Sequence, residues 1–342
     1  MAKFVSTIIN DKNVWERFVL LNKPQSFLQS WNWGETQIYC GAKVLRLGIF
    51  KGHKLVGVAQ IIEQVAKRGK HMLIPGGPLI DWDNSELVSF FLDDIKRLAR
   101  KSGVWFVRLR AELPGSSENR AKFRRLGFVK APMHLHAENT WLLDINPQGG
   151  EDQLLADMRK TTRYLVKKSL TYGFELVKTN DVKKSQVLFE LQKDTLKRHK
   201  FVGFSKNIFE GQLATFGKDN EAELYIGSYN GKFQNAAIII YYGDTAYYHH
   251  SASSDTSKNI PIAYYLQWRV IQEARKRGLA HYNFWGVAPS DNPRHRFYGV
   301  TLFKKGFGGR QVDFLPAQDL PISPLYFLTY IFEMSRKVLR RL

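Results

Sequence analysis

The chain has 342 residues, of which 44% are hydrophobic and 13% aromatic, so a disordered protein is excluded and two domains of ordinary size are expected. Lysine and arginine (51) outnumber aspartate and glutamate (31), and the net charge of +20 favours polyanionic partners: nucleic acid, nucleotide-linked substrates or an anionic membrane. The single cysteine, Cys40, excludes an internal disulfide framework and a multi-cysteine zinc site.

The beginning of the chain suggests a compartment. Residues 1–10 lack a long apolar core followed by a small-residue cleavage site, which argues against secretion. No run in the sequence approaches the ~18 uninterrupted apolar residues that a membrane span needs. A cytoplasmic protein is therefore expected.

Two hairpins are predicted, one in each half of the chain. Residues 44–62 indicate a strand, a turn at Gly52 and a returning strand. Residues 224–241 show the same pattern around Asn230 and Gly231, which is a strong hairpin signal because both residues tolerate a positive φ. The two halves therefore begin their central part in the same way.

Each hairpin is followed by a predicted amphipathic helix, at residues 87–100 and 263–275, and then by a glycine and another strand. Gly103 and Gly278 follow these helices, and they keep nearly the separation that the two hairpin turns have. Conserved order and spacing predict two copies of one α/β unit. The join is expected in a Pro/Gly loop at 146–150, which gives domains 1–147 and 148–342.

A hairpin followed by a helix and a strand is the order found in acyltransferases of the GNAT superfamily. The expected fold is therefore α/β, with two tandem GNAT-like domains of mixed β-sheets flanked by helices. That superfamily binds acyl-CoA through a glycine-spaced loop before the helix, and the links here, 75–81 and 251–257, lack that spacing. Acetyl-CoA is disfavoured as the donor, and no cofactor is expected.

A long basic helix is predicted from residue 151 to residue 172, ending at Gly173. It has two interpretations. Most charge runs are solvated helix faces, whereas a cluster of this density also suits a surface for a polyanion. The cations are Arg159, Lys160, Arg163, Lys167 and Lys168.

The stretch 301–309 places two adjacent cations, Lys304 and Lys305, immediately before Gly306 and a Gly-Gly pair. Glycine allows the backbone to bend closely around a ligand, and a lysine at such a bend can face a phosphate or a developing oxyanion. The competing interpretation is a basic hairpin between two late strands.

The last predicted helix is aromatic-rich over 325–334 and basic over 335–342. It is expected either to make a peripheral contact with an anionic inner membrane or to pack its apolar face on the second domain. Packing is favoured, because exposed aromatic patches are costly.

Taken together, these segments resemble the Fem family of peptidoglycan-branching aminoacyltransferases, specifically members without a long helical arm. The resemblance covers almost the whole chain in order. It rests on segments 27–35, 75–81, 158–169, 195–198, 248–253, 265–268 and the Phe-Lys-Lys-Gly-Phe-Gly-Gly run 303–309.

The resemblance implies transfer of an amino acid from aminoacyl-tRNA to the stem-peptide side-chain amine of a UDP- or lipid-linked muropeptide precursor, forming interpeptide bridges. It implies that Lys304 is the catalytic cation, with Phe303 beside it. It also implies that Arg198 and Tyr248 bind the precursor and that Asp81 lies near the acceptor. The competing interpretations are an exposed helix arginine, a packed strand tyrosine and a turn aspartate.

Because the helical arm is absent, the resemblance implies that the five cations of the basic helix and Lys305 bind tRNA. The chain is expected to be monomeric. The sequence departs from the family pattern at Gln37, where a phosphate-contacting lysine is usual. That charge would then come from Lys43 or Arg46. Asn283 and Trp285 also depart from the pattern and imply an altered acceptor pocket.

Three alternatives remain at this level. The first is a Fem-like N-acyltransferase with another acyl donor or acceptor. The second is a non-catalytic RNA-binding protein, although no RNA-binding signature is present. The third is a metal site at His134 and His136 or at His249 and His250, but paired histidines without further ligands at suitable spacing are poor evidence, so no metal is expected.

Overall fold

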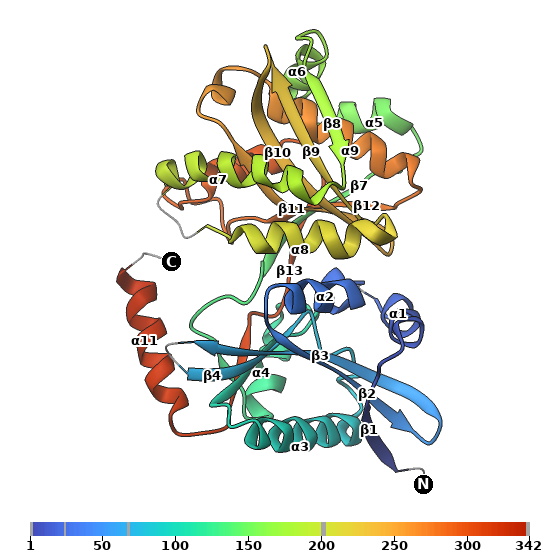
Figure 1. Ribbon diagram of the computed structural model, residues 1–342, viewed down its shortest axis with the longest axis vertical. Helices are drawn as coiled ribbons and strands as arrows, with labels where there is room; N and C mark the ends of the chain where they lie inside the picture. The colour runs from blue at the N-terminus through green and yellow to red at the C-terminus, as the bar shows by residue number, and fades with distance from the viewer. Residues whose placement is uncertain (1–2, 24, 67–68, 200–202, 340–342) are drawn as a thin grey trace. The chain divides into compact units, whose positions relative to one another are not determined.

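The computed structural model describes residues 3–23, 25–66, 69–199 and 203–339. The chain forms two compact units: unit 1 comprises residues 1–138 and 313–342, and unit 2 comprises residues 139–312. Within the described residues, each unit contains one seven-stranded sheet with helices packed against it (Figure 1).

The sheet of unit 1 has the strand order β1-β2-β3-β4-β5-β14-β6. β4 and β5 are parallel, whereas the other neighbours are antiparallel. The strands are β1 (Phe4–Ile8), β2 (Lys43–Lys51), β3 (Lys54–Ala66), β4 (Gly69–Pro75), β5 (Phe106–Arg110), β6 (Val129–Lys130) and β14 (Gln318–Pro321).

The helices of unit 1 lie on both faces of its sheet, and Figure 1 shows α3 below the sheet and α2 above it. α3 begins where the Asn84 side chain accepts a hydrogen bond from the Leu87 amide, and its apolar stripe forms the core with the sheet. The helices are α1 (Lys12–Leu21), the 3₁₀ turn η1 (Phe27–Gln29), α2 (Trp31–Tyr39), α3 (Ser85–Lys101), α4 (Ser117–Arg125) and α11 (Tyr326–Leu339).

The sheet of unit 2 has the strand order β13-β7-β12-β11-β10-β9-β8, and its parallel pair is β11 and β12. The strands are β7 (Asn139–Asp144), β8 (Glu175–Thr179), β9 (Ala222–Tyr229), β10 (Lys232–Tyr242), β11 (Thr245–Ser253), β12 (His281–Gly286) and β13 (Arg310–Asp313). The helices are α5 (Gly150–Asp157), α6 (Lys160–Ser169), η2 (Val182–Lys184), α7 (Ser185–His199), α8 (Lys206–Phe216), η3 (Gly217–Asp219), η4 (Thr256–Asn259), α9 (Ile262–Lys276) and α10 (Tyr298–Lys305).

The predicted duplication is confirmed. A hairpin, a third strand, a crossover helix and a parallel strand occur as β2-β3-β4-α3-β5 in unit 1 and as β9-β10-β11-α9-β12 in unit 2. Gly52, Asn230 and Gly231 have positive φ in the two hairpin turns, as the turn chemistry predicts. The fold is α/β with two mixed sheets flanked by helices.

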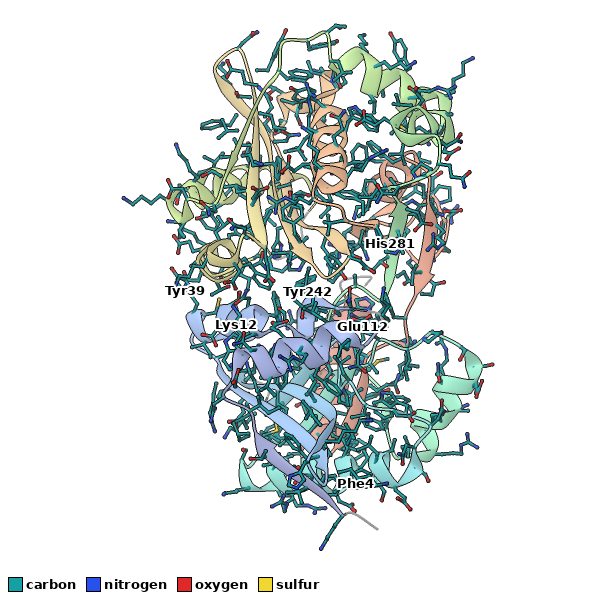
Figure 2. All side chains as sticks on the ribbon, turned by 90° about the vertical axis from the view of Figure 1, so that its right-hand side faces the viewer. Phe4, Lys12, Tyr39, Glu112, Tyr242 and His281 are labelled. Atoms are coloured by element: carbon teal, nitrogen blue, oxygen red, sulfur yellow. The ribbon has the colours of Figure 1, made fainter. Side chains whose placement is uncertain are left out.

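Two strands belong to the other unit from the one that sequence order predicts. β7 pairs antiparallel with β12 of unit 2, where His281 Nδ1 lies 2.7 Å from Asp144 Oδ1. His281 of β12 is labelled in Figure 2. The equivalent place beside β5 of unit 1 is taken by β14 from the end of the chain. The predicted boundary between residues 147 and 148 therefore falls inside unit 2. The C-terminal helix belongs to unit 1, which corrects the expectation that it packs on the second domain.

Two other expectations are corrected. The predicted basic helix 151–172 is two helices, α5 and α6, because Met158 takes an extended conformation and buries its side chain in the core of unit 2. The stretch 301–309 is not a hairpin. It is the last turn of α10 followed by a glycine-rich exit, in which Gly308 and Gly309 have positive φ.

Candidate active site

Lys304 lies in the last turn of α10, and its side chain points into unit 2 rather than to solvent. Its Nζ donates a hydrogen bond to the carbonyl oxygen of Gly286 at the end of β12, at 2.6 Å. Only 7% of the residue is exposed, and this burial lowers the pKa of Lys304 from 10.5 to about 7. A lysine with such a pKa exchanges its proton readily near neutral pH.

The strand that supplies this carbonyl ends in an unusual turn. Trp285 has a φ of +64°, a left-handed conformation that a bulky residue seldom adopts. The turn is supported by Asn283, whose Oδ1 accepts a hydrogen bond from the Trp285 amide at 2.8 Å. This conformation directs the Gly286 carbonyl, the acceptor for Lys304. The two residues noted as departures from the family pattern therefore support the lysine.

The Trp285 indole belongs to an aromatic corner of unit 2. Its ring packs edge-on against Tyr247 and His249, with centroid distances of 6.0 Å and 5.1 Å. The neighbouring His250 is buried, and burial lowers its pKa to about 3, so it is neutral at physiological pH. Within the described residues, no group of three or more His, Cys, Asp or Glu side chains is placed to hold a metal ion.

The glycine after the lysine pair brings α10 and α6 together. The Arg159 amide donates to the carbonyl oxygen of Gly306 at 3.0 Å, immediately before α6 begins. A side-chain carbon at Gly306 would collide with the hydroxyl of Thr162, so only glycine permits this approach. The basic helix therefore starts directly beside the helix that carries Lys304.

The two adjacent lysines have opposite environments. Lys305 keeps a quarter of its side chain exposed, pairs with Asp291 at 2.5 Å and lies 5.2 Å from the centre of the Trp141 ring. Phe303, on the other side of Lys304, packs edge-on against Tyr264 and belongs to the aromatic packing under α10. Phe303 therefore helps to fix the position of α10.

The cations of α6 give this helix a positive surface. Arg159, Lys160, Lys167 and Lys168 are exposed, whereas Arg163 is half-buried and donates to the Ala156 carbonyl at 3.1 Å. The ammonium of Lys168 lies 5.8 Å from the rings of both Tyr164 and Tyr172, and Tyr164 is 60% exposed. Exposed aromatic rings among cations are the combination that stacks bases while holding phosphates.

The two predicted precursor-binding residues of unit 2 lie on different secondary-structure elements. Tyr248 lies in β11, half-buried against the core of unit 2, and burial raises its pKa. Arg198 lies in α7, but its side chain is outside the described part of the chain.

The predicted acceptor residues Asp81 and Gln37 belong to unit 1. Asp81 is exposed, and its Oδ1 accepts a hydrogen bond from the Asp83 amide at 3.0 Å in the turn before α3. Gln37 is buried in α2. Lys43, one proposed source of positive charge, is paired with Glu63 at 3.0 Å.

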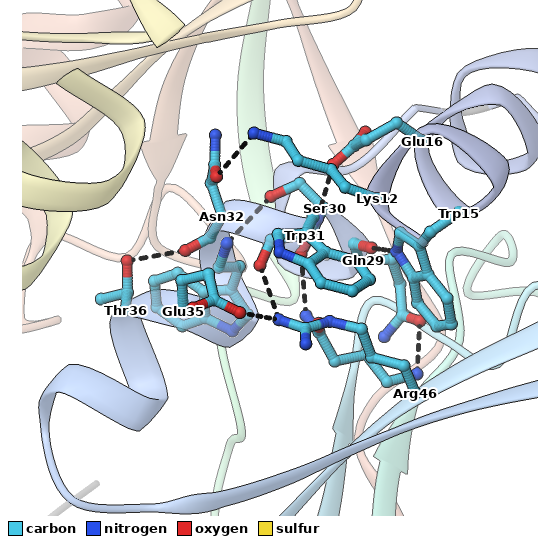
Figure 3. Close-up of polar contacts among 12 residues, drawn as sticks. Lys12, Trp15, Glu16, Gln29, Ser30, Trp31, Asn32, Glu35, Thr36 and Arg46 are labelled. Atoms are coloured by element: carbon cyan, nitrogen blue, oxygen red, sulfur yellow. Dashed lines mark hydrogen bonds and ion pairs between the residues drawn. The ribbon is translucent and has the colours of Figure 1, made fainter. Parts of the chain in front are cut away.

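Arg46, the other proposed source, is held within unit 1. Its guanidinium stacks 3.6 Å from the centre of the Trp31 ring and donates to Glu35 at 2.7 Å (Figure 3). It also donates to the Trp31 carbonyl at 3.0 Å and to Gln60 at 3.2 Å. These contacts fasten α2 to the sheet, so the charge of Arg46 serves the fold.

Sequence reasoning singled out Lys304 but missed the Gly286 carbonyl as its partner. An indirect signal was present, because asparagine readily accepts a hydrogen bond from the amide two residues later. The sequence Asn283-Phe284-Trp285 therefore indicates a turn, although it does not indicate which side chain the turn serves.

Solved structures place this fold among known proteins. The crystal structure of FemX matches with a TM-score of 0.82 and 18% sequence identity, covering 95% of this chain and 99% of that chain. A tandem GNAT protein from the clavulanic acid biosynthesis pathway matches with a TM-score of 0.59 and 12% identity, over 94% of this chain. The fold therefore defines a tandem GNAT-like protein.

Sequence comparison narrows the class to a family. The FemAB family model matches residues 11–234 and 220–333, so the chain belongs to the FemAB family. A relative from Staphylococcus aureus (strain MRSA252) named "Lipid II:glycine glycyltransferase" is 20% identical over 92% of each chain. The family resemblance drawn from the motifs is confirmed, and so is the enzyme class, an aminoacyltransferase.

Proposed function

We propose that this protein transfers an amino acid from aminoacyl-tRNA to the side-chain amine in the stem peptide of a peptidoglycan precursor. The observation that carries the proposal is Lys304, a buried lysine with a pKa near 7 at the end of α10 in a FemAB-family protein. The similar Staphylococcus aureus protein named for lipid II and glycine transfer supports a peptidoglycan precursor as the acceptor.

The reaction is aminolysis of an ester. The neutral amine of the stem peptide attacks the ester carbonyl, and an oxyanion develops as the new C–N bond forms. The C–O bond to the ribose then breaks, the ribose oxygen gains a proton, and the attacking nitrogen loses one. The Lys304 ammonium stabilises the negative oxygen and supplies the proton to the ribose, because its pKa lies near neutral pH.

The donor suits the charge of unit 2. The exposed cations of α6 attract the phosphates of tRNA, and this helix begins beside Gly306, two residues after Lys304. The proposed tRNA contacts are Arg159, Lys160, Arg163, Lys167, Lys168 and Lys305. Phe303 supports the lysine as a positioning residue.

The acceptor is proposed to be a lipid-linked precursor, with Arg198, Tyr248, Asp81 and Gln37 as binding residues. A lipid-linked acceptor is confined to the membrane, so the chain acts at the cytoplasmic face of the membrane. The protein is proposed to act as a monomer and to contact the membrane through its C-terminal helix. Among the described helices, none combines the length and the hydropathy that a membrane crossing requires.

Transfer of labelled amino acid from charged tRNA to a UDP- or lipid-linked pentapeptide tests the proposal. Lys304→Ala is expected to lower kcat by about 10²–10³-fold with the fold intact, which is the usual cost of losing an oxyanion donor. Lys305→Ala is the matched control and is expected to cost much less, because that ammonium is already paired with Asp291. Equal losses would mean that Lys304 is not the catalytic cation.

Two outcomes favour the alternatives. Absence of transfer from any aminoacyl-tRNA, with activity on another acyl donor or acceptor, identifies a Fem-like N-acyltransferase of different specificity. Tight tRNA binding without turnover identifies an RNA-binding protein. Either outcome would overturn the proposed reaction.

A further inference from the structure

The C-terminal helix α11 is amphipathic, but its apolar side faces outward and its more polar side is buried. The side packed against unit 1 is partly polar, since Tyr326, Thr329 and Glu333 are buried. The outer side is apolar, and each of its large side chains is more than a third exposed. These side chains are Phe327, Leu328, Ile331, Phe332, Met334, Val338 and Leu339.

A buried ion-pair network holds α11 in this orientation. The Arg108 guanidinium on β5 donates to Glu333 of α11 at 2.7 Å and to Asp319 of β14 at 2.7 and 2.8 Å. The Tyr326 hydroxyl, at the start of α11, donates to the same aspartate at 3.1 Å. Turning the helix to bury its apolar side would break the contacts that α11 makes with this network, Glu333 with Arg108 and Tyr326 with Asp319. The apolar face is therefore fixed toward the outside.

The charge on α11 indicates which surface this face suits. The only acidic residue in the helix, Glu333, is buried beneath it and already paired, whereas Arg336 and Lys337 lie in the last turn. A contiguous exposed apolar surface with cations at one end is complementary to a layer of apolar chains beneath anionic headgroups. The net charge of +20 acts in the same direction.

The length of α11 decides how it meets a bilayer. Its 14 residues span ~21 Å, well short of the ~30 Å hydrocarbon core. Its buried side is also committed to unit 1, so it offers lipid one face only. The helix therefore suits a position in the plane of the interface, beside its unit (Figure 1).

We propose that the outer face of α11 is a membrane-docking surface that inserts its aromatic and aliphatic side chains into an anionic lipid bilayer. Arg336 and Lys337 then lie at the level of the headgroups. The biological role of this surface rests on the proposed function, in which the acceptor is lipid-linked. Lipid binding itself is measured without tRNA or precursor, so its failure is distinguishable from failure of the proposed transfer.

Vesicle flotation with the full chain tests the surface. Parent protein is expected to float with vesicles of phosphatidylglycerol and phosphatidylcholine, and much less with phosphatidylcholine alone. The double variant Phe327→Ser with Ile331→Ser is expected to lower the partition coefficient by at least about tenfold, because two large apolar side chains no longer enter the lipid. Leu21→Ser is the control, since Leu21 is a comparably exposed apolar residue on α1.

The charges are tested separately. Arg336→Gln with Lys337→Gln is expected to reduce binding to the anionic vesicles and to weaken its dependence on salt, while leaving thermal unfolding unchanged. Unchanged flotation of the Phe327/Ile331 variant would overturn the proposal. A concentration-dependent dimer that the same variant abolishes, with no flotation of the parent, would also overturn it and assign the face to a second copy of the chain.

Discussion

Replacing Lys304 with methionine should change how stability depends on pH. In the folded protein burial lowers the pKa of Lys304 to about 7, whereas in the unfolded chain the same amine has its ordinary pKa of 10.5. Between these values the unfolded state binds more protons, so the free energy of unfolding of the parent rises with pH. Methionine has nearly the same length and no titrating group, so the part of this rise that Lys304 contributes should disappear.

The magnitude follows from the two pKa values. A difference of this size disfavours the buried ammonium by about 5 kcal/mol at low pH, and the penalty falls by up to about 1.4 kcal/mol for each pH unit. From pH 7 to pH 9 the advantage of the methionine variant should therefore shrink by about 2 kcal/mol. Loss of the hydrogen bond to Gly286 costs about 1–3 kcal/mol, but this cost is the same at both values of pH.

Urea unfolding at pH 7, 8 and 9, followed by tryptophan fluorescence, measures the difference. Lys305→Met is the matched control, because Lys305 is partly exposed and paired with Asp291, and its effect should change little over this range. A gap between parent and Lys304→Met that stays constant from pH 7 to pH 9 would refute the reasoning. It would mean that Lys304 keeps its ammonium in the folded protein throughout.

Three further changes have defined outcomes. Gly306→Ala should lower the free energy of unfolding by about 1–3 kcal/mol in urea titration, whereas Gly299→Ala, in open space in the same helix, should not lower it. Glu333→Gln should cost about 1.5–3 kcal/mol, because the buried arginine of β5 loses a charge-assisted hydrogen bond while keeping its pair with Asp319, and an unchanged free energy of unfolding would contradict this. Asn283→Ala should lower kcat about 5–30-fold by releasing the Trp285 amide, with Asn283→Asp restoring most of it.

Much of the fold could be predicted because it is specified locally. Turn residues with positive φ, such as Asn230 and Gly231, require a hairpin wherever they lie in space. Amphipathic periodicity and a terminal glycine mark the crossover helices α3 and α9 to within a few residues. Two such sets in the same order identified the duplicated α/β unit.

The break in the basic helix could not be predicted in the same way. Residues on both sides of Met158 favour a helix, but the helix is interrupted there. Met158 is buried in the core of unit 2, and the amide of Arg159 donates a hydrogen bond to the carbonyl oxygen of Gly306, which is distant in sequence. Partners distant along the chain leave no periodic signal. The placement of β7 in the sheet of unit 2 and of β14 in the sheet of unit 1 could not be predicted for the same reason.

The sequence by itself determined the repeated unit, the family motifs and the position of the lysine pair before Gly306. Only the tertiary structure decided that Lys304 is buried on the Gly286 carbonyl while Lys305 remains near solvent, because helical rotation turns neighbouring residues in different directions. Tertiary contacts also decided that α11 keeps its apolar side outward. The reason is the buried charge of Arg108, which only carboxylates distant in sequence can neutralise.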